Sequence, residues 1–467
     1  MVSIYSDDTI CALSTAAGGA MAVIRISGGE ALTIVAGIFR SSSGKPLSDS
    51  RNHSARYGEI LDDDGNVVDD VVALVMRSPH SYTGEDTVEV SCHGSHYIIS
   101  RLLHLLISHG CRQARPGEFT QRAFLNEKMD LSQAEAVADL ISSTNSATHQ
   151  MAMSQLRGHF SSELTTLRDR LLHLTSLLEL ELDFSDHDVE FADRSELLSL
   201  ASETEAHISR LADSFATGKA LREGIAVAII GKTNVGKSTL LNHLLHDDKA
   251  IVSDIHGTTR DVIEDTTQIN GVCFRFIDTA GIRNTTDAIE RMGIERTYRK
   301  LDEASIVIWM TDAPPSAEEA REMVSLAKEK KLIAVVNKMD KLADDYSPLE
   351  YAGSDLQPLV ASIPVVHISA KHDINIDKLE EAIHSASGIP SITQNDVIVT
   401  SARHYEALTK ALTDIRAVKN GLENGLSGDL LSEDLRSCIA HLSEIVGGAI
   451  STDETLANIF SHFCVGK

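Results

Sequence analysis

The chain has 467 residues, of which 42% are hydrophobic, and its formal charge is −26 at pH 7. A protein this acidic is not expected to bind nucleic acid through a broad basic surface, so any RNA contact must be local or carried by a more basic partner. No apolar run approaches the ~20 residues of a membrane span, residues 1–8 lack a signal-peptide pattern, and the six cysteines form no Cys-x-x-Cys pair. These features predict a cytoplasmic protein without a membrane partner.

The first 126 residues have the pattern of a mixed α/β domain. Strand-like runs are Met21–Ser27, Val71–Met76 and Thr87–Cys92, and a turn-rich segment covers residues 62–66. The amphipathic stretch Ile98–Leu106 predicts a helix. At roughly 150 residues per domain, the whole chain predicts about three domains.

Residues 127–220 have a different texture, with no proline and with apolar residues at helical spacing. This pattern predicts long packed helices, and the same periodicity returns in residues 385–467. Residues 221–384 alternate strand and helix signals, as an α/β nucleotide-binding domain does. Two arrangements fit: one helical domain split by an inserted nucleotide domain, or two separate helical units.

A glycine-containing loop, Gly231–Thr239, follows the apolar run Ile225–Ile230 and precedes a helical segment. Strand, loop and helix in this order predict a P-loop, whose N–H groups and helix N-terminus face phosphates. Lys237 is expected to reach the β- and γ-phosphates, and the Ser238 hydroxyl to bind Mg²⁺. The alternative is an ordinary glycine-rich turn. The candidate phosphate-binding residues are Gly231, Asn234, Val235, Gly236, Lys237, Ser238 and Thr239.

A second motif, Asn337-Lys338-Met339-Asp340, follows an apolar strand-like run and selects the base. The Asp340 carboxylate can accept two hydrogen bonds from guanine, whereas adenine would leave it unpaired at a cost. A further segment, Ser369-Ala370-Lys371, is expected to place a backbone N–H near guanine O6. The tetrapeptide alone would also fit a polar turn, so the interpretation depends on its position after a P-loop.

The switch residues are expected between these two motifs. Asp278, in Asp278-Thr279-Ala280-Gly281, is expected to hold Mg²⁺ through water, and the Gly281 N–H to contact the γ-phosphate. Thr258 and Thr259 are candidates for the first switch, with Thr259 a Mg²⁺ ligand.

Position 282 is isoleucine, where many GTPases have a glutamine that orients the attacking water. Hydrolysis therefore needs another water-positioning group and another positive charge. Asn234 is a candidate ligand for a monovalent cation, and Glu290 a candidate for positioning water. The residue type alone would equally fit a solvated surface glutamate at position 290.

Several further segments carry a resemblance to one family along the whole chain. They are Ile24–Gly28, Tyr82–Asp86, Arg115–Phe119, Ala123–Lys128, Gly257–Asp261 and the C-terminal Cys464-Val465-Gly466-Lys467. With the inserted GTPase domain, they make the chain resemble the MnmE (TrmE) family of tRNA-modification GTPases, within the TrmE-Era-EngA-like superfamily.

The resemblance implies a reaction and a fold for the N-terminal domain. Family members act with the FAD-dependent partner MnmG to install an aminomethyl-type group, such as carboxymethylaminomethyl, at C5 of the wobble uridine of certain tRNAs. Their N-terminal domain resembles folate-binding aminomethyltransferase domains, forms a homodimer and binds a tetrahydrofolate such as 5-formyltetrahydrofolate. Arg25, Glu89, Lys128 and Lys467 match the family's folate-site positions.

The resemblance also implies a potassium-dependent GTPase cycle. Asn234, Thr258 and the backbone groups of Ser253 and Ile255 match the K⁺ site, and Glu290 matches the catalytic glutamate. The K⁺ ion would supply the charge that an arginine finger supplies elsewhere. Hydrolysis would drive association of two GTPase domains, within a heterotetramer or larger complex of the homodimer with MnmG.

Two other classes of function remain open from the sequence. One is a regulatory GTPase that binds the ribosome or rRNA and modifies nothing. The other is a stand-alone folate-dependent one-carbon enzyme with a regulatory GTPase domain. The chain has no basic RNA-binding module that would favour the first of these two classes.

Overall fold

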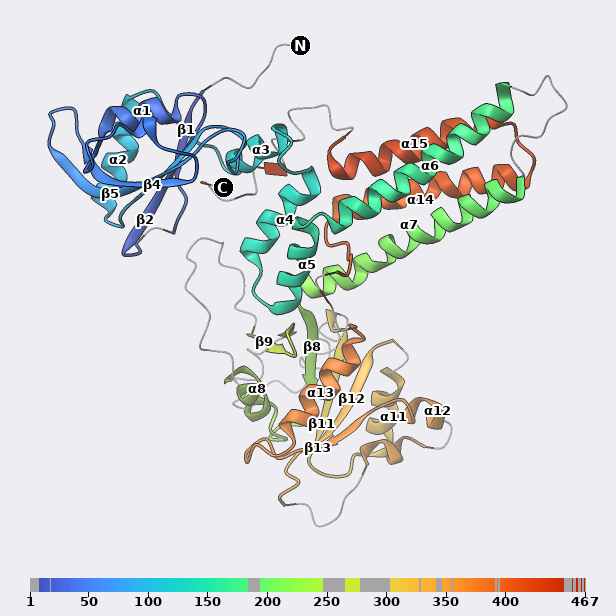
Figure 1. The fold of residues 1–467 in the computed structure, drawn as a ribbon. Coiled ribbons are helices and arrows are strands. Elements are labelled where there is room, and N and C mark those ends of the chain that lie inside the picture. The colour runs from blue at the N-terminus through green and yellow to red at the C-terminus, as the bar shows by residue number, and fades with distance from the viewer. Residues whose placement is uncertain are drawn as a thin grey trace. The chain divides into compact units, whose positions relative to one another are not determined.

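The computed structural model describes residues 8–16, 18–183, 194–246, 265–277, 303–326, 329–341, 347–353, 356–390, 393, 395–448, 456, 459, 460, 463 and 466. The chain separates into two compact units (Figure 1). The first comprises Met1–Ser142, Ala152–Ser209 and Glu406–Lys467, and the second comprises Ser143–Met151 and Arg210–Tyr405. None of the helices in these described parts has the length and apolarity needed to cross a bilayer.

The first unit contains a seven-stranded sheet in the order β3-β4-β5-β6-β2-β1-β7. Its strand pairs are antiparallel except for β1 with β7. The strands are β1 (Ile10–Leu13), β2 (Met21–Ser27), β3 (Phe39–Ser41), β4 (Ser54–Leu61), β5 (Val67–Met76), β6 (Thr87–His93) and β7 (Arg112–Gln113).

The two faces of this sheet differ, because strand side chains alternate between them. One face buries residues such as Ile24, Ala73 and Val90 against the helices α1 (Ala31–Ile38) and α2 (His96–Ser108). The other face, called the outer face below, carries Arg25 and Glu89 together with exposed apolar side chains. The three predicted strands and the predicted helix are confirmed, although β5 begins four residues earlier than expected.

Helices make up the rest of the first unit. The long helix α6 (His159–Asp183) packs against α15 (Gly428–Val446), and Glu205 of α7 (Arg194–Glu223) pairs with Arg416 and Lys419 of α14 (Ala402–Glu423). Helices from both sides of residues 221–384 thus pack together. The shorter helices are α3 (Glu118–Leu125) and α4 (Leu131–Ser142), while α5 (Ser146–Leu156) begins in the second unit and ends in the first.

The second unit is built on a six-stranded sheet in the order β13-β12-β11-β8-β10-β9. All neighbouring strands are parallel except β9 and β10. Its strands are β8 (Ile225–Ile230), β9 (Asp265–Ile269), β10 (Val272–Phe276), β11 (Ile306–Thr311), β12 (Lys331–Val336) and β13 (Val365–His367). Its helices include α8 (Lys237–His246), α11 (Ala317–Leu326), η2 (Pro348–Ala352), α12 (Gln357–Val360) and α13 (Ile376–Ser387).

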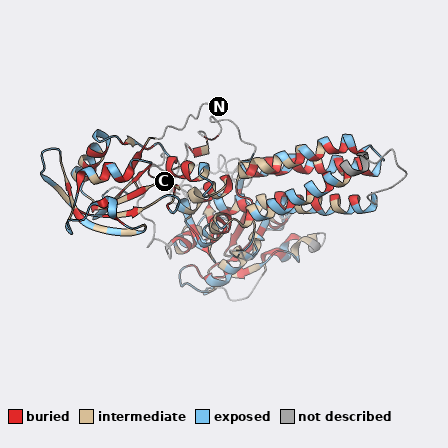
Figure 2. Ribbon diagram, turned by 45° about the horizontal axis from the view of Figure 1, so that its top comes forward, coloured by how far each residue is buried: buried red, intermediate tan, exposed pale blue. Residues whose placement is uncertain are grey.

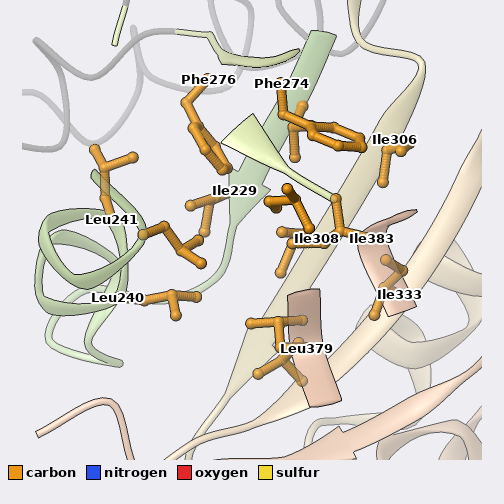
Figure 3. Close-up of a cluster of buried hydrophobic side chains, with 14 of the residues drawn as sticks. Ile229, Leu240, Leu241, Phe274, Phe276, Ile306, Ile308, Ile333, Leu379 and Ile383 are labelled. Atoms are coloured by element: carbon orange, nitrogen blue, oxygen red, sulfur yellow. The ribbon is translucent and has the colours of Figure 1, made fainter. Parts of the chain in front are cut away.

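Helices cover both faces of this second sheet, which explains why its central strands are continuously apolar. Ile306 and Ile308 of β11 face α8 and α13, as Figure 3 shows. Val307 and Trp309, on the alternate positions, face α11 and η2. Figure 2 colours the described residues by how far each is buried. Parallel packing also brings the carboxyl ends of β8, β11 and β12 to one edge, where α/β proteins bind ligands.

Candidate functional site

The loop between β8 and α8 lies at this carboxyl edge and can be formed only with glycine at two positions. Gly231 has φ +150° and Gly236 has φ +107°. A Cβ at Gly231 would clash with the Met310 carbonyl oxygen, and a Cβ at Gly236 with Nδ2 of Asn337. The loop therefore passes close to β11 and to the segment after β12, and α8 begins directly behind it at Lys237.

The Lys237 side chain is hydrogen-bonded to the backbone of the phosphate loop. Its ammonium donates hydrogen bonds to the carbonyl oxygens of Gly231, at 2.6 Å, and Lys232, at 2.7 Å. Burial lowers the pKa of this amine. The N-terminal turn of α8, which also contains Ser238 and Thr239, adds the partial positive charge of a helix terminus. Phosphate oxygens are the ligands that such a cradle fits.

Asn337 joins this loop to the segment after β13. Its side chain is only 3% exposed, donates to the Val235 carbonyl oxygen at 2.8 Å, and accepts from the Ala370 N–H at 3.0 Å. Three candidate segments that are separate in the sequence are therefore held together by one amide. Sequence reasoning had placed these segments at one site, but it had not assigned this bridging role to Asn337.

Lys338 makes a second link to the loop. Its ammonium donates to the Asn234 carbonyl oxygen at 2.9 Å and pairs with Asp312 Oδ2 at 2.6 Å. Sequence reasoning missed Asp312. The available signal was its position directly after the apolar strand β11, at the same edge as the P-loop.

Asp340 accepts a hydrogen bond from the Ser369 hydroxyl at 2.7 Å, and this bond lowers the pKa of the carboxyl group. The carboxylate thus remains ionised and able to accept from a base. Two hydrogen bonds in the same loop reduce the choice of backbone N–H groups that could donate to guanine O6. The Ser369 N–H donates to the Ile374 carbonyl, and the Ala370 N–H donates to Asn337, which leaves Lys371 as the candidate donor.

The remaining predicted GTPase residues lie outside the described residues. They are Ser253, Ile255, Thr258, Thr259, Asp278, Thr279, Ala280, Gly281 and Glu290. Their roles in holding Mg²⁺ and K⁺, and in positioning water, stay predictions.

The outer face of the first sheet holds the second candidate site. Arg25 of β2 and Glu89 of β6 are directly opposite in register, and Arg25 Nε donates to Glu89 Oε1 at 2.8 Å. The guanidinium carbon lies 5.3 Å from the centre of the Tyr82 ring and 5.6 Å from that of Phe119. Burial raises the pKa of the Tyr82 phenol, so the site contains a neutral aromatic wall beside an ion pair.

Lys128 and the C-terminal motif make no described contact with the Arg25–Glu89 pair. The Lys128 ammonium donates to the Pro79 carbonyl oxygen at 2.8 Å rather than to the Arg25–Glu89 pair. Lys467 and Cys464 lie outside the described residues. The Gly466 carbonyl oxygen, however, accepts a hydrogen bond at 3.1 Å from the hydroxyl of Ser14, the residue directly after β1. β1 pairs with β2, so Gly466 lies at the end of the strand next to the one that carries Arg25.

A partly buried ionic network beside this site was not foreseen. Arg122 pairs with Asp8 at 2.7 Å and with Glu85 at 3.1 Å, and Glu85 accepts from the Ser27 hydroxyl at 2.8 Å. Because Ser27 is on the same strand as Arg25, the network fixes the end of β2. Its partners are far apart in sequence, so no local pattern indicated the pairing.

The largely parallel second sheet carries a phosphate loop that depends on two glycines and is held by Asn337 and Lys338. The Asp340 carboxylate can accept hydrogen bonds from a base. These features define a P-loop protein of the GTPase class. Two family models match: the N-terminus of the GTP-binding protein TrmE over residues 9–128, and the MnmE helical domain over residues 131–464. The chain belongs to the MnmE family of tRNA modification GTPases. It is a GTP-hydrolysing enzyme of tRNA modification.

Full-length relatives have the same description. The tRNA modification GTPase MnmE of Bacteroides fragilis is 54% identical, with 99% of this chain and 100% of the relative covered. That of Parabacteroides distasonis is 55% identical, with 98% and 100% covered. Among solved structures, Era of Aquifex aeolicus is 28% identical over 40% of this chain and 66% of Era, but its TM-score of 0.26 is too low to establish a shared fold.

Proposed function

We propose that this GTPase acts with an FAD-dependent partner of the MnmG type to install an aminomethyl-type group at C5 of the wobble uridine of certain tRNAs. The observation that carries the proposal is identity above one half along the full length of relatives named tRNA modification GTPase MnmE. Since tRNA is the substrate, the cytoplasm is the expected location.

Within the nucleotide site, each proposed role follows from position. Lys237 and the start of α8 hold the phosphates, while Asp340 and the Lys371 N–H recognise guanine. Ser238, Thr259 and Asp278 are the proposed Mg²⁺ residues. The magnesium ion supplies charge neutralisation of the phosphates when bound.

Potassium is the proposed second cation, held by Asn234, Ser253, Ile255 and Thr258. The side chain of Asn234 is exposed at the crest of the loop, and its oxygen is a neutral donor of the kind that suits a monovalent cation. The ion would add positive charge near the leaving phosphate. Glu290 is the proposed residue that positions the attacking water.

The outer face is the proposed tetrahydrofolate site. An arginine can pair with the glutamate-tail carboxylates, a carboxylate can accept from the amide-like edge of a pterin, and Tyr82 and Phe119 offer ring surfaces for packing. Bound tetrahydrofolate supplies the one-carbon unit. Arg25, Glu89, Lys128 and Lys467 are the proposed binding residues.

A homodimer is proposed through the same face. Met21 is 65% exposed, Tyr57 58% and Val72 39%, and all three lie on the outer face of the sheet. Large apolar side chains grouped on an open sheet face are typical of a protein interface.

Nucleoside mass spectrometry of tRNA from a deletion strain tests the proposed function. Loss of the C5 modification at the wobble uridine, with recovery on complementation, is the expected result. Intact modification together with accumulating ribosome precursors would instead identify a ribosome-associated GTPase. Modification that persists when Lys237→Ala replaces the wild type would indicate a folate enzyme whose GTPase domain is only regulatory.

Two kinetic measurements test the hydrolysis residues. GTPase rates in K⁺ and Na⁺ buffers should differ strongly, and equal rates would remove the cation role of Asn234. Glu290→Ala should reduce turnover while GTP affinity stays nearly unchanged. Unaltered turnover would exclude Glu290 from catalysis.

A further inference from the structure

The segment of residues 42–53, called the 42–53 loop, connects the edge strand β3 to β4 in the first unit. Four cationic side chains lie in or beside it: Lys45, Arg51, Arg56 and Arg77. Within the described residues, none of the four forms an ion pair with a carboxylate. Lys45 and Arg51 are exposed on the loop itself, so their charges face solvent.

The loop is held in one shape by the other two cations. Arg77 donates to the Ser48 carbonyl oxygen at 2.6 Å and to that of Ser50 at 3.4 Å, and Arg56 Nε donates to Ser50 Oγ at 3.1 Å. These acceptors carry no net charge. Two arginines therefore stabilise the loop while their positive charges remain uncompensated, which preorganises it for an anion.

The local charge balance is the reverse of that of the chain. Residues 42–58 contain three Lys or Arg (Lys45, Arg51 and Arg56) and one acidic residue, Asp49, whereas the chain has 42 Lys and Arg against 68 Asp and Glu. A polyanion would be repelled by most of such a surface and attracted to this loop. The exposed residues Ser42-Ser43-Gly44, which directly follow β3, also offer hydroxyl groups that suit phosphate contacts.

We propose that the 42–53 loop, with Arg56 and Arg77 behind it, binds the phosphate backbone of the tRNA that the enzyme acts on. This inference rests on the proposed function, because it takes tRNA as the polyanion. Such a contact resolves how a chain of charge −26 can approach RNA: the contact is local and electrostatic, and it positions the RNA without reading bases.

The test uses the full-length double variant Lys45→Gln/Arg51→Gln, which removes both solvent-facing cations and leaves the stabilising arginines intact. The probe is an unmodified transcript of a tRNA with a wobble uridine, titrated between 50 and 200 mM salt. The matched control is Lys378→Gln/Arg210→Gln, which removes the same charge from exposed positions in the second unit. GTPase turnover and thermal unfolding of both variants check that they are folded.

Loss of two phosphate contacts should reduce the slope of log affinity against log salt by ~1.8, so the affinity ratio between 50 and 200 mM salt falls about tenfold. The control should keep the wild-type slope. An unchanged slope in the double variant, or an equal reduction in the control, overturns the proposal. The proposal is also overturned if the double variant keeps the wild-type salt slope for RNA but binds the FAD-dependent partner more weakly. That result would indicate that the loop contacts an acidic surface of a protein. In each case wobble-uridine modification by the wild type is measured separately, so the proposed function can stand when this inference fails.

Discussion

Replacing Asn337 with alanine should weaken GTP binding more than any other single truncation in the base-side loop. The amide is buried, and it satisfies the Val235 carbonyl and the Ala370 N–H at 2.8 Å and 3.0 Å. Each group left without a partner costs ~1–3 kcal/mol. Where nucleotide binding requires both groups to be paired, even the lower bound for the two, about 2 kcal/mol, corresponds to an affinity loss of about thirtyfold.

The assay is equilibrium titration with a fluorescent GDP analogue, with thermal unfolding recorded in parallel. Asn375→Gly is the matched control: its side chain donates to the His367 carbonyl oxygen at 2.8 Å but does not bond to the P-loop, and its φ of +56° suits glycine. The control should lower stability with little effect on affinity. If Asn337→Ala binds nucleotide within about threefold of wild type, the bridge does not hold the binding loop.

Three further predictions concern single contacts. Gly236→Ala should impair nucleotide binding at least as much as Asn337→Ala, and the double variant should be no worse than Gly236→Ala, because the added Cβ displaces that amide; additive losses would contradict this. Asp312→Asn should weaken binding by up to about fivefold, since its pair with Lys338 is partly exposed, and high salt should erase the difference. Glu205→Gln should cost up to ~1 kcal/mol of unfolding free energy at pH 7. Hydrogen bonds from Lys419 and Arg416 lower the pKa of Glu205, so this difference should begin to shrink below the ordinary glutamate pKa of about 4.3 and vanish as the pH falls through the lowered value; a pH-independent difference in urea unfolding would refute it.

Local patterns in the sequence were sufficient for the elements of the nucleotide site. β8 and β12 are apolar because both faces of their sheet are covered by helices. The spacing of the glycines in residues 231–239 is sufficient to predict the P-loop. The start of β5 was missed because Asp69 and Asp70 interrupt the apolar run. Asp69 is accommodated within β5 by hydrogen bonds from the backbone N–H and the ring of His93, which lies on the neighbouring strand β6.

The contacts that could not be predicted all join residues distant in sequence. Asp312 reaches Lys338, Arg122 reaches Asp8 and Glu85, and Arg77 stabilises a loop almost thirty residues before it. Single-residue chemistry indicates that such groups need partners but not which ones. For the same reason the Lys128 bond to Pro79 did not follow from the resemblance that placed Lys128 at the folate site.

The hydrogen bond between Ser14 and Gly466 spans 452 positions of the chain. During synthesis β1 leaves the ribosome first, while its last partner is made only after the whole second unit has been translated. The helices of the first unit also pack late, because Arg416 and Lys419, the partners of Glu205, are synthesised after the second unit. The second unit is continuous from Arg210 to Tyr405 and needs only a short earlier segment, so it can fold during that interval. A translating chain thus completes its GTP-binding unit before the contact between Ser14 and Gly466 can form.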